Sequence, residues 1–158
     1  MSRAFVSEEA AEANAAVLPE RPVSTHPNLV TPNGLKLIED QVSRLQGLLA
    51  AAAQDDLDRP RLARDLRYWQ ARRASARLMD APTAPPEEVA FGTTVAIRKA
   101  NGEAGRYRIV GEDEADPPKG LLSWTAPLAQ ALLGARMGEV VEVPGRPAVT
   151  VEAIGVGD

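Results

Sequence analysis

The sequence predicts an α+β fold, in which an antiparallel helical hairpin precedes a small antiparallel sheet with one short helix. Apolar residues recur at alternating spacings of three and four between residues 35 and 76, which is the period of paired helices. From residue 89 onward the apolar period is two, as in a half-buried strand. A proline-rich stretch, residues 81–88, separates the two patterns and predicts a linker.

The first 30 residues are predicted to form a disordered tail. They are rich in Ala, Glu and Pro, and Pro19, Pro22 and Pro27 interrupt any regular element. The single histidine of the chain, His26, lies in this tail without a neighbouring ligand. No metal-binding or catalytic role is therefore predicted for it.

Residues 31–80 predict the helical hairpin. Thr31 is a suitable N-cap, and Pro32 occupies the first helical position, where a missing N–H has no consequence. The apolar positions of the first helix are Leu35, Ile38, Val42, Leu45, Leu49 and Ala52. After a turn at residues 54–60, a second helix is expected from about Pro60 to Met79, with Leu62, Leu66, Trp69, Arg73 and Ala76 at the same spacing. Arg73 is the weak position of this second stripe.

Residues 89–158 predict the sheet domain. Strands are expected at residues 89–98, 106–110, 121–124, 140–143 and 148–154. Asn101-Gly102 is a hairpin turn signal, and a short helix is expected from Pro127 to Leu133. Four acidic residues lack the ligand spacing of a Ca²⁺ loop and are expected to form a solvated turn: Glu112, Asp113, Glu114 and Asp116.

Composition narrows the function classes. The formal net charge of −4 argues against a general nucleic-acid binder, and the lack of cysteine excludes disulfides and thiolate metal sites. No apolar run approaches the roughly 20 residues that span a bilayer, so a cytoplasmic location is expected. The sequence has no glycine-rich phosphate loop and no nucleophile elbow. We therefore expect no enzyme, no catalytic residue, and no metal or cofactor of its own.

The block from Tyr107 to Gly138 resembles the C-terminal domain of the bacterial Gre-type (GreA/GreB-like) transcription elongation factors. The family pattern there reads approximately YxIVGxxEAD, then ISxxSPlaxALlG, then GD. This chain supplies Tyr107, Ile109, Val110, Gly111, Glu114, Ala115, Asp116, Ser123, Pro127, Leu128, Ala131, Leu132 and Gly134. It departs from the pattern at Ala126 and Glu139. In the hairpin, Tyr68, Ala71 and Arg72 are similar to the family's second-helix pattern.

The resemblance implies regulation of transcription elongation by binding to core RNA polymerase. In Gre factors the helical arm enters the secondary channel, and the C-terminal domain docks at the rim of the largest subunit. By position, the docking residues would be Ser123, Trp124, Thr125, Ala126 and Pro127. A monomer is expected, which meets nucleic acid only within the transcription complex and binds no membrane.

The resemblance also implies an FKBP-like fold for residues 89–154. Prolyl-isomerase activity does not follow from it. An aromatic-lined pocket of the kind that this activity needs is not evident among Phe91, Tyr107 and Trp124.

In Gre factors two carboxylates at the arm tip help to hold the second catalytic Mg²⁺ of the polymerase, an ion shared between the two proteins. Two alignments of this tip are open. One places Arg61 and Arg64 at the carboxylate positions. The other, favoured by the break in the apolar spacing, makes Asp55, Asp56 and Asp58 the candidate metal ligands and shortens the arm.

Neither alignment preserves both carboxylates, so weak or no transcript cleavage is expected. The alternative function is that of a shortened-arm polymerase-binding regulator, which resembles the regulator of nucleoside diphosphate kinase and does not stimulate cleavage. The second helix also carries a candidate basic, channel-facing stripe of Arg59, Arg61, Arg64, Arg67, Arg72 and Arg73. A solvated charged face is the competing interpretation of these arginines.

Overall fold

The computed structural model describes residues 18–157, and these residues divide into two compact units. The hairpin unit holds residues 38–75 together with the segment before His26. The sheet unit holds residues 26–37 and everything from Ala76 onward. Helix α2 (Pro32–Ala51) begins in the sheet unit and continues into the hairpin unit, where α3 (Arg59–Ser75) follows it.

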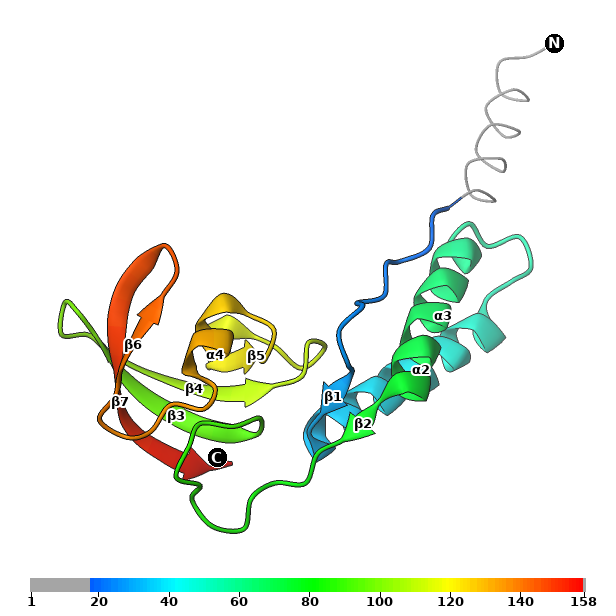
Figure 1. Ribbon diagram of the computed structural model, residues 1–158. Helices are drawn as coiled ribbons and strands as arrows, with labels where there is room; N and C mark the ends of the chain where they lie inside the picture. Colours follow the sequence, from blue (N-terminus) through cyan, green and yellow to red (C-terminus); the bar gives the residue numbers. More distant parts are fainter. Residues whose placement is uncertain (1–17, 158) are drawn as a thin grey trace. The chain divides into compact units, whose positions relative to one another are not determined.

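The predicted helical hairpin is confirmed (Figure 1). The predicted N-cap of its first helix is confirmed as well. The Gly34 N–H donates to Thr31 Oγ1 at 3.0 Å, which fills one of the backbone donors that a helix start leaves without a partner. The buried positions of the hairpin are those of the apolar stripes: Ile38, Val42, Leu45 and Leu62. In α3, however, Arg72 rather than Arg73 lies in the interior, with 1% of its surface exposed.

Helix α3 ends at Ser75, four residues earlier than the expected Met79. The next residues instead form strand β2 (Arg77–Leu78), which pairs in parallel with β1 (Leu29–Val30). The Arg77 N–H donates to Asn28 O at 2.8 Å, and the Met79 N–H donates to Val30 O at 2.9 Å. The chain segments just before α2 and just after α3 are thus hydrogen-bonded to each other.

The sheet unit contains a five-stranded sheet of order β5-β4-β3-β7-β6. Its strands are β3 (Thr93–Lys99), β4 (Ala104–Val110), β5 (Leu121–Ser123), β6 (Val140–Val143) and β7 (Arg146–Val156). The 3₁₀ turn η1 (Pro117–Lys119) precedes β5, and the short helix α4 (Pro127–Leu132) follows it. The predicted α+β class is confirmed, but the sheet is mixed because β4 and β5 run parallel.

The core of the sheet unit follows the period of two. Val95 and Ile97 of β3, Ile109 of β4 and Val151 of β7 are at most 1% exposed. They pack in one cluster with Ala129 and Leu132 of α4. Val89 belongs to this cluster too, although it lies outside a regular strand and its N–H donates to Ala135 O at 2.8 Å. The expected strand at residues 89–98 therefore begins four residues later, at Thr93.

Part of the expected disordered tail has a defined conformation. Residues 1–17 lie outside the described residues, as does residue 158. From Leu18 the chain has no helix and no strand until β1, which agrees with the three prolines in this stretch. Its end is nevertheless buried, with Asn28 4% and Val30 3% exposed. This difference from the prediction arises because partners far along the chain hold the segment.

Two glycines give a test of this packing. A Cβ at Gly111 would lie 2.4 Å from the backbone oxygen of Leu29, whereas a Cβ at Gly47 would meet nothing within 4 Å. We expect Gly111→Ala to lower the free energy of unfolding by about 1–3 kcal/mol, because backbone must move to relieve the clash. Gly47→Ala, in an exposed helix interior, should raise it by up to about 1 kcal/mol. Chemical denaturation of both variants measures this, and equal stability of the two would contradict it.

Candidate functional site

The acidic turn that follows β4 contains a buried carboxylate. Glu114 is 4% exposed, and its two oxygens accept hydrogen bonds from Thr31 Oγ1 and, at 3.0 Å, from Asn33 Nδ2. A Cβ at Gly34 would lie 2.9 Å from Glu114 Oε1, so the glycine leaves room for the carboxylate. The start of a helix favours negative charge, and Glu114 supplies it to α2. The expectation of a solvated turn is therefore wrong for Glu114.

The candidate docking residues form a compact turn that runs from the last residue of β5 to the first residue of α4. Ser123 Oγ lies 2.7 Å from Thr125 Oγ1 and accepts the Thr125 N–H at 3.2 Å. Gln130 Nε2 donates to Trp124 O at 2.6 Å, which holds the turn against α4. Pro127 is exposed at the first position of α4, and Ala126 is half-buried. The structure thus brings the five candidates together on one turn.

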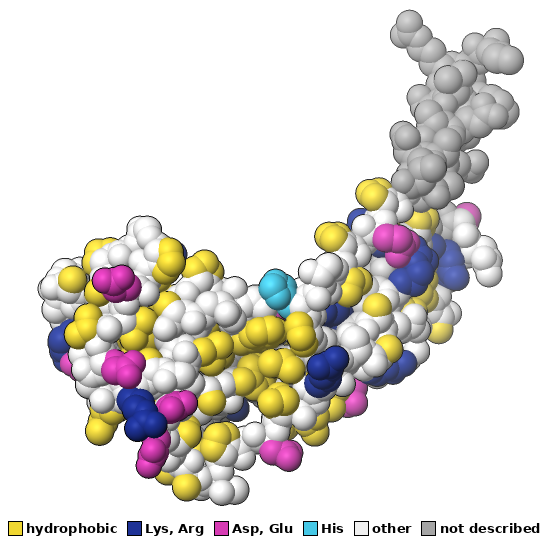
Figure 2. Space-filling model, viewed as in Figure 1, with side chains coloured by type: hydrophobic (Ala, Val, Ile, Leu, Met, Phe, Trp, Pro, Cys, Tyr) yellow, Lys and Arg dark blue, Asp and Glu magenta, His cyan; other side chains and the backbone are white. Residues whose placement is uncertain are grey.

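The side chain of Trp124 in this turn is half-buried rather than fully exposed. It packs against the core of the sheet unit, and its ring meets the ring of His26 edge-on, with 5.8 Å between ring centroids. The indole Nε1 is buried and has no hydrogen-bond partner among the described residues. The histidine, cyan in Figure 2, lies at the surface. His26 therefore takes part in the packing of Trp124.

The tip of the hairpin is the connection between α2 and α3, where the break in apolar spacing placed it. Asp56 Oδ1 accepts the Asp58 N–H at 2.8 Å, and Asp58 lies 3.5 Å from Arg61 in an ion pair. The three candidate aspartates are exposed. Between residues 18 and 157, no group of three or more His, Cys, Asp or Glu residues is arranged to hold a metal ion. Asp56 and Asp58 thus take part in the turn and in the start of α3.

The six arginines of the candidate stripe have different environments. Arg59 Nη1 donates to Leu49 O and Ala52 O, both at 3.0 Å, and so satisfies carbonyls at the end of α2. Arg72 is buried, which removes it from any exposed stripe. The remaining members are exposed or half-buried: Arg61, Arg64, Arg67 and Arg73. Figure 2 shows basic side chains gathered over the hairpin with acidic ones beside them.

Sequence reasoning missed the contacts of Leu18–Thr25, which we call the strap. The Glu20 carboxylate receives hydrogen bonds from Arg67, with Nε 3.0 Å from both oxygens and Nη2 2.5 Å from Oε1. The Arg21 guanidinium lies 3.9 Å from the ring centre of Tyr68 and 3.6 Å from Asp65 Oδ1. Hydrogen bonding to Arg67 lowers the pKa of Glu20, and the same bond raises the pKa of Arg67.

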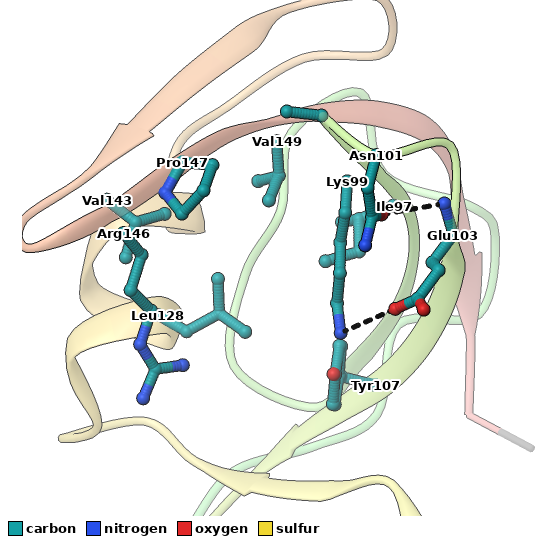
Figure 3. Close-up of a pocket in the computed structure, with 11 residues that line it drawn as sticks. Ile97, Lys99, Asn101, Glu103, Tyr107, Leu128, Val143, Arg146, Pro147 and Val149 are labelled. Carbon is teal, nitrogen blue, oxygen red and sulfur yellow. Dashed lines mark hydrogen bonds and ion pairs between the residues drawn. The ribbon is translucent and has the colours of Figure 1, made fainter.

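The sheet unit also has a cavity of about 320 Å³, shown in Figure 3. Leu128 of α4 and Val149 of β7 line it from one side, and Ile97 and Tyr107 line it from the other. At the rim, Lys99 Nζ lies 3.8 Å from Glu103 Oε2. Tyr107 is the one aromatic residue among those that line it.

The chain combines a helical hairpin with a small α+β sheet unit that carries the Ser123–Pro127 turn. Comparison with known proteins shows the family to which a chain of this architecture belongs. Residues 84–156 match the model of the C-terminal region of transcription elongation factor GreA/GreB. Transcription elongation factor GreA of Desulfovibrio desulfuricans is 35% identical over 149 residues, covering 80% of this chain and 91% of that protein. GreA of Phenylobacterium zucineum is 33% identical over 135 residues, covering 72% and 86%. The chain belongs to the GreA/GreB family of transcription elongation factors.

Among solved structures, the chain is similar to GreA factor homolog 1 (Gfh1) of Thermus thermophilus. The two are 19% identical, with a TM-score of 0.40, and the match covers 82% of this chain and 99% of that one. None of the helices between residues 18 and 157 is long and apolar enough to cross a membrane.

The strap contact has a testable pH dependence. Because the pKa of Glu20 in the folded protein is lowered, the contact stabilises the fold above the ordinary pKa of a glutamate and is lost as the pH falls through the lowered value. An NMR titration of the Glu20 carboxyl should therefore have its midpoint below the ordinary value. In Arg67→Gln the midpoint should return toward that value, and in the control Arg73→Gln it should stay low. An ordinary midpoint in the parent protein would contradict the contact.

Proposed function

We propose that this protein regulates transcription elongation by binding core RNA polymerase, with the helical arm in the secondary channel and the sheet unit docked at the channel rim. Membership of the GreA/GreB family supports this proposal. The observation that carries it is the turn from Ser123 to Pro127, which is held by a hydrogen bond within the turn and by a second from Gln130 of α4. A turn already held in one conformation loses little entropy on docking.

The proposed mechanism of the arm is occupancy of the channel rather than delivery of a metal ion. Asp56 accepts a hydrogen bond within the local turn, and Arg61 pairs with Asp58. An arginine so close would oppose binding of a divalent cation by like charge. An arm in the channel would then compete with other channel-binding factors and with incoming nucleotide.

The short arm also favours occupancy of the channel over delivery of a metal ion. It leaves the shortened-arm polymerase-binding regulator as the second candidate function. Helices α2 and α3 contain 20 and 17 residues. At 1.5 Å per residue they extend roughly 30 and 25 Å. An arm of this length, shorter than the arm that the resemblance to Gre factors implies, would occupy the channel without stimulating transcript cleavage.

Substitution of side chains in the docking turn should weaken the affinity for core RNA polymerase. Trp124→Ala together with Pro127→Ala is expected to weaken the affinity tenfold or more, because an anchor residue of an interface commonly contributes about 2 kcal/mol. Binding of labelled protein to core polymerase measures this. Trp124 also packs on the core, so Thr125→Ala with Pro127→Ala provides a milder second variant. Unchanged affinity in both folded variants would exclude this turn as the docking surface.

The tip aspartates should prove dispensable. We expect little Mg²⁺-dependent cleavage of RNA in a backtracked elongation complex, and the same low rate after Asp55, Asp56 and Asp58 are all replaced by alanine. The physical reason is that neither alignment of the tip preserves both carboxylate positions of the Gre family, and that Arg61 lies beside Asp58. Gel analysis of the cleaved transcript provides the measurement. Robust cleavage that disappears in the triple variant would establish metal delivery instead.

A further inference from the structure

We propose that the α3 face covered by the strap is a protein-binding surface, for which the strap and RNA polymerase compete. The surface consists of Asp65, Arg67 and Tyr68, and its present occupant is the Glu20-Arg21 dipeptide. The polymerase part of this inference rests on the proposed function. Such competition would make the strap autoinhibitory, because it covers the binding surface of α3 until a partner displaces it.

The strap recognises α3 through two adjacent residues of opposite charge. Glu20 meets Arg67 in a geometry where both carboxylate oxygens and two guanidinium nitrogens take part. Arg21 meets Asp65 as an ion pair and Tyr68 through a cation–π contact. Tyr68 is supported from the side by Trp69, with 5.1 Å between ring centroids. These contacts form a matched set of charge and aromatic partners rather than a single chance ion pair.

The sequence of the strap favours an extended conformation before it binds. Pro19 and Pro22 flank the charged dipeptide, and each proline fixes its own φ angle. The residue before each proline is also biased toward extended backbone. A segment that is already restricted in this way loses less conformational freedom when it docks. The strap is thus suited to lie along a helix without joining a sheet.

The contact is suited to exchange because water reaches it. The side chains of Arg67 and Glu20 are 54% and 61% exposed, so solvent screens their attraction. The strap residues that make the contacts are polar, and no strap residue is among the buried core of the chain. A partner with complementary charges can replace such contacts without opening the hairpin. Displacement would release the Arg67 guanidinium and the Tyr68 ring together.

The chemistry of the surface favours a protein over a nucleic acid as the competing partner. Asp65 pairs with Arg64 at 3.1 Å as well as with Arg21, so it keeps a cationic partner when the strap leaves. Arg67 would attract a carboxylate or a phosphate, but the Tyr68 ring holds a guanidinium, a group that a protein supplies and a nucleic acid does not. A protein surface that carries a carboxylate next to a guanidinium satisfies both Arg67 and Tyr68, as the strap does. We therefore assign the partner as a protein surface that carries a carboxylate next to an arginine, and we take this partner to be RNA polymerase on the strength of the proposed function.

The test compares the full-length protein with the strap variant Glu20→Gln/Arg21→Gln. The first readout is the NMR signal of Arg67 Nε–H, which reports strap seating without polymerase and should shift in the variant. The second is affinity for core polymerase, which should become about fourfold tighter if the strap covers the surface three quarters of the time. Glu152→Gln is the matched control, because it removes a similar exposed carboxylate–arginine pair, with Arg98, in the sheet unit. Its affinity should equal that of the parent.

The outcomes separate this inference from the proposed function. A shifted Arg67 signal with unchanged or weaker polymerase binding would overturn the competition and leave the proposed function in place. An unshifted signal would show that the strap is not seated in solution, which also overturns it. Failure of all three proteins to bind polymerase would reject the proposed function, and the competition with it. A single-stranded RNA probe that moves the parent's Arg67 signal to its position in the strap variant would overturn the assignment to a protein partner.

Discussion

The hydrogen bonds of the buried Glu114 are the interaction on which the organisation of this chain depends. Through them, a loop that follows β4 in the sheet supplies the negative charge at the start of α2, more than 80 residues earlier in the chain. Burial makes this contact demanding, because a carboxylate taken out of water needs partners for both oxygens. Thr31 and Asn33 provide them, and Gly34 keeps the space open. The first turn of α2 is for this reason part of the sheet unit rather than only the beginning of an arm.

Local signals predicted those features whose causes are local. The Thr31 cap with Pro32, the apolar spacing of α2 and the turn before α3 each depend on residues a few positions apart, and each is found as expected. The burial of Glu114 has no such signal, because its partners lie far away in the sequence. The sequence also could not show which of Arg72 and Arg73 is buried. Spacings of three and four both keep a residue on one helix face, and packing selects between them.

The strap and the start of the sheet show a second limit of sequence reasoning. The prolines correctly indicated that residues 18–30 form no helix, but a lack of regular structure is not a lack of contacts. The contacts require Arg67 and Tyr68 side by side on a helix that must already exist. Val89 was expected in a strand because it is apolar at the right spacing, and it is indeed buried. The period of two therefore predicted the burial of Val89 correctly, but Val89 lies outside any regular strand.

The pairing of β1 with β2 gives the hairpin a closed base. The chain leaves this base at Thr31, travels out along α2, returns along α3 and meets its own starting point at Arg77. Everything between is a loop whose ends are already joined, and lengthening such a loop adds little to the entropy cost of closing it. Whole heptads could therefore be inserted into or deleted from both helices without any change to the base. The length of the helical arm can then change without any change to the β1–β2 pairing at its base.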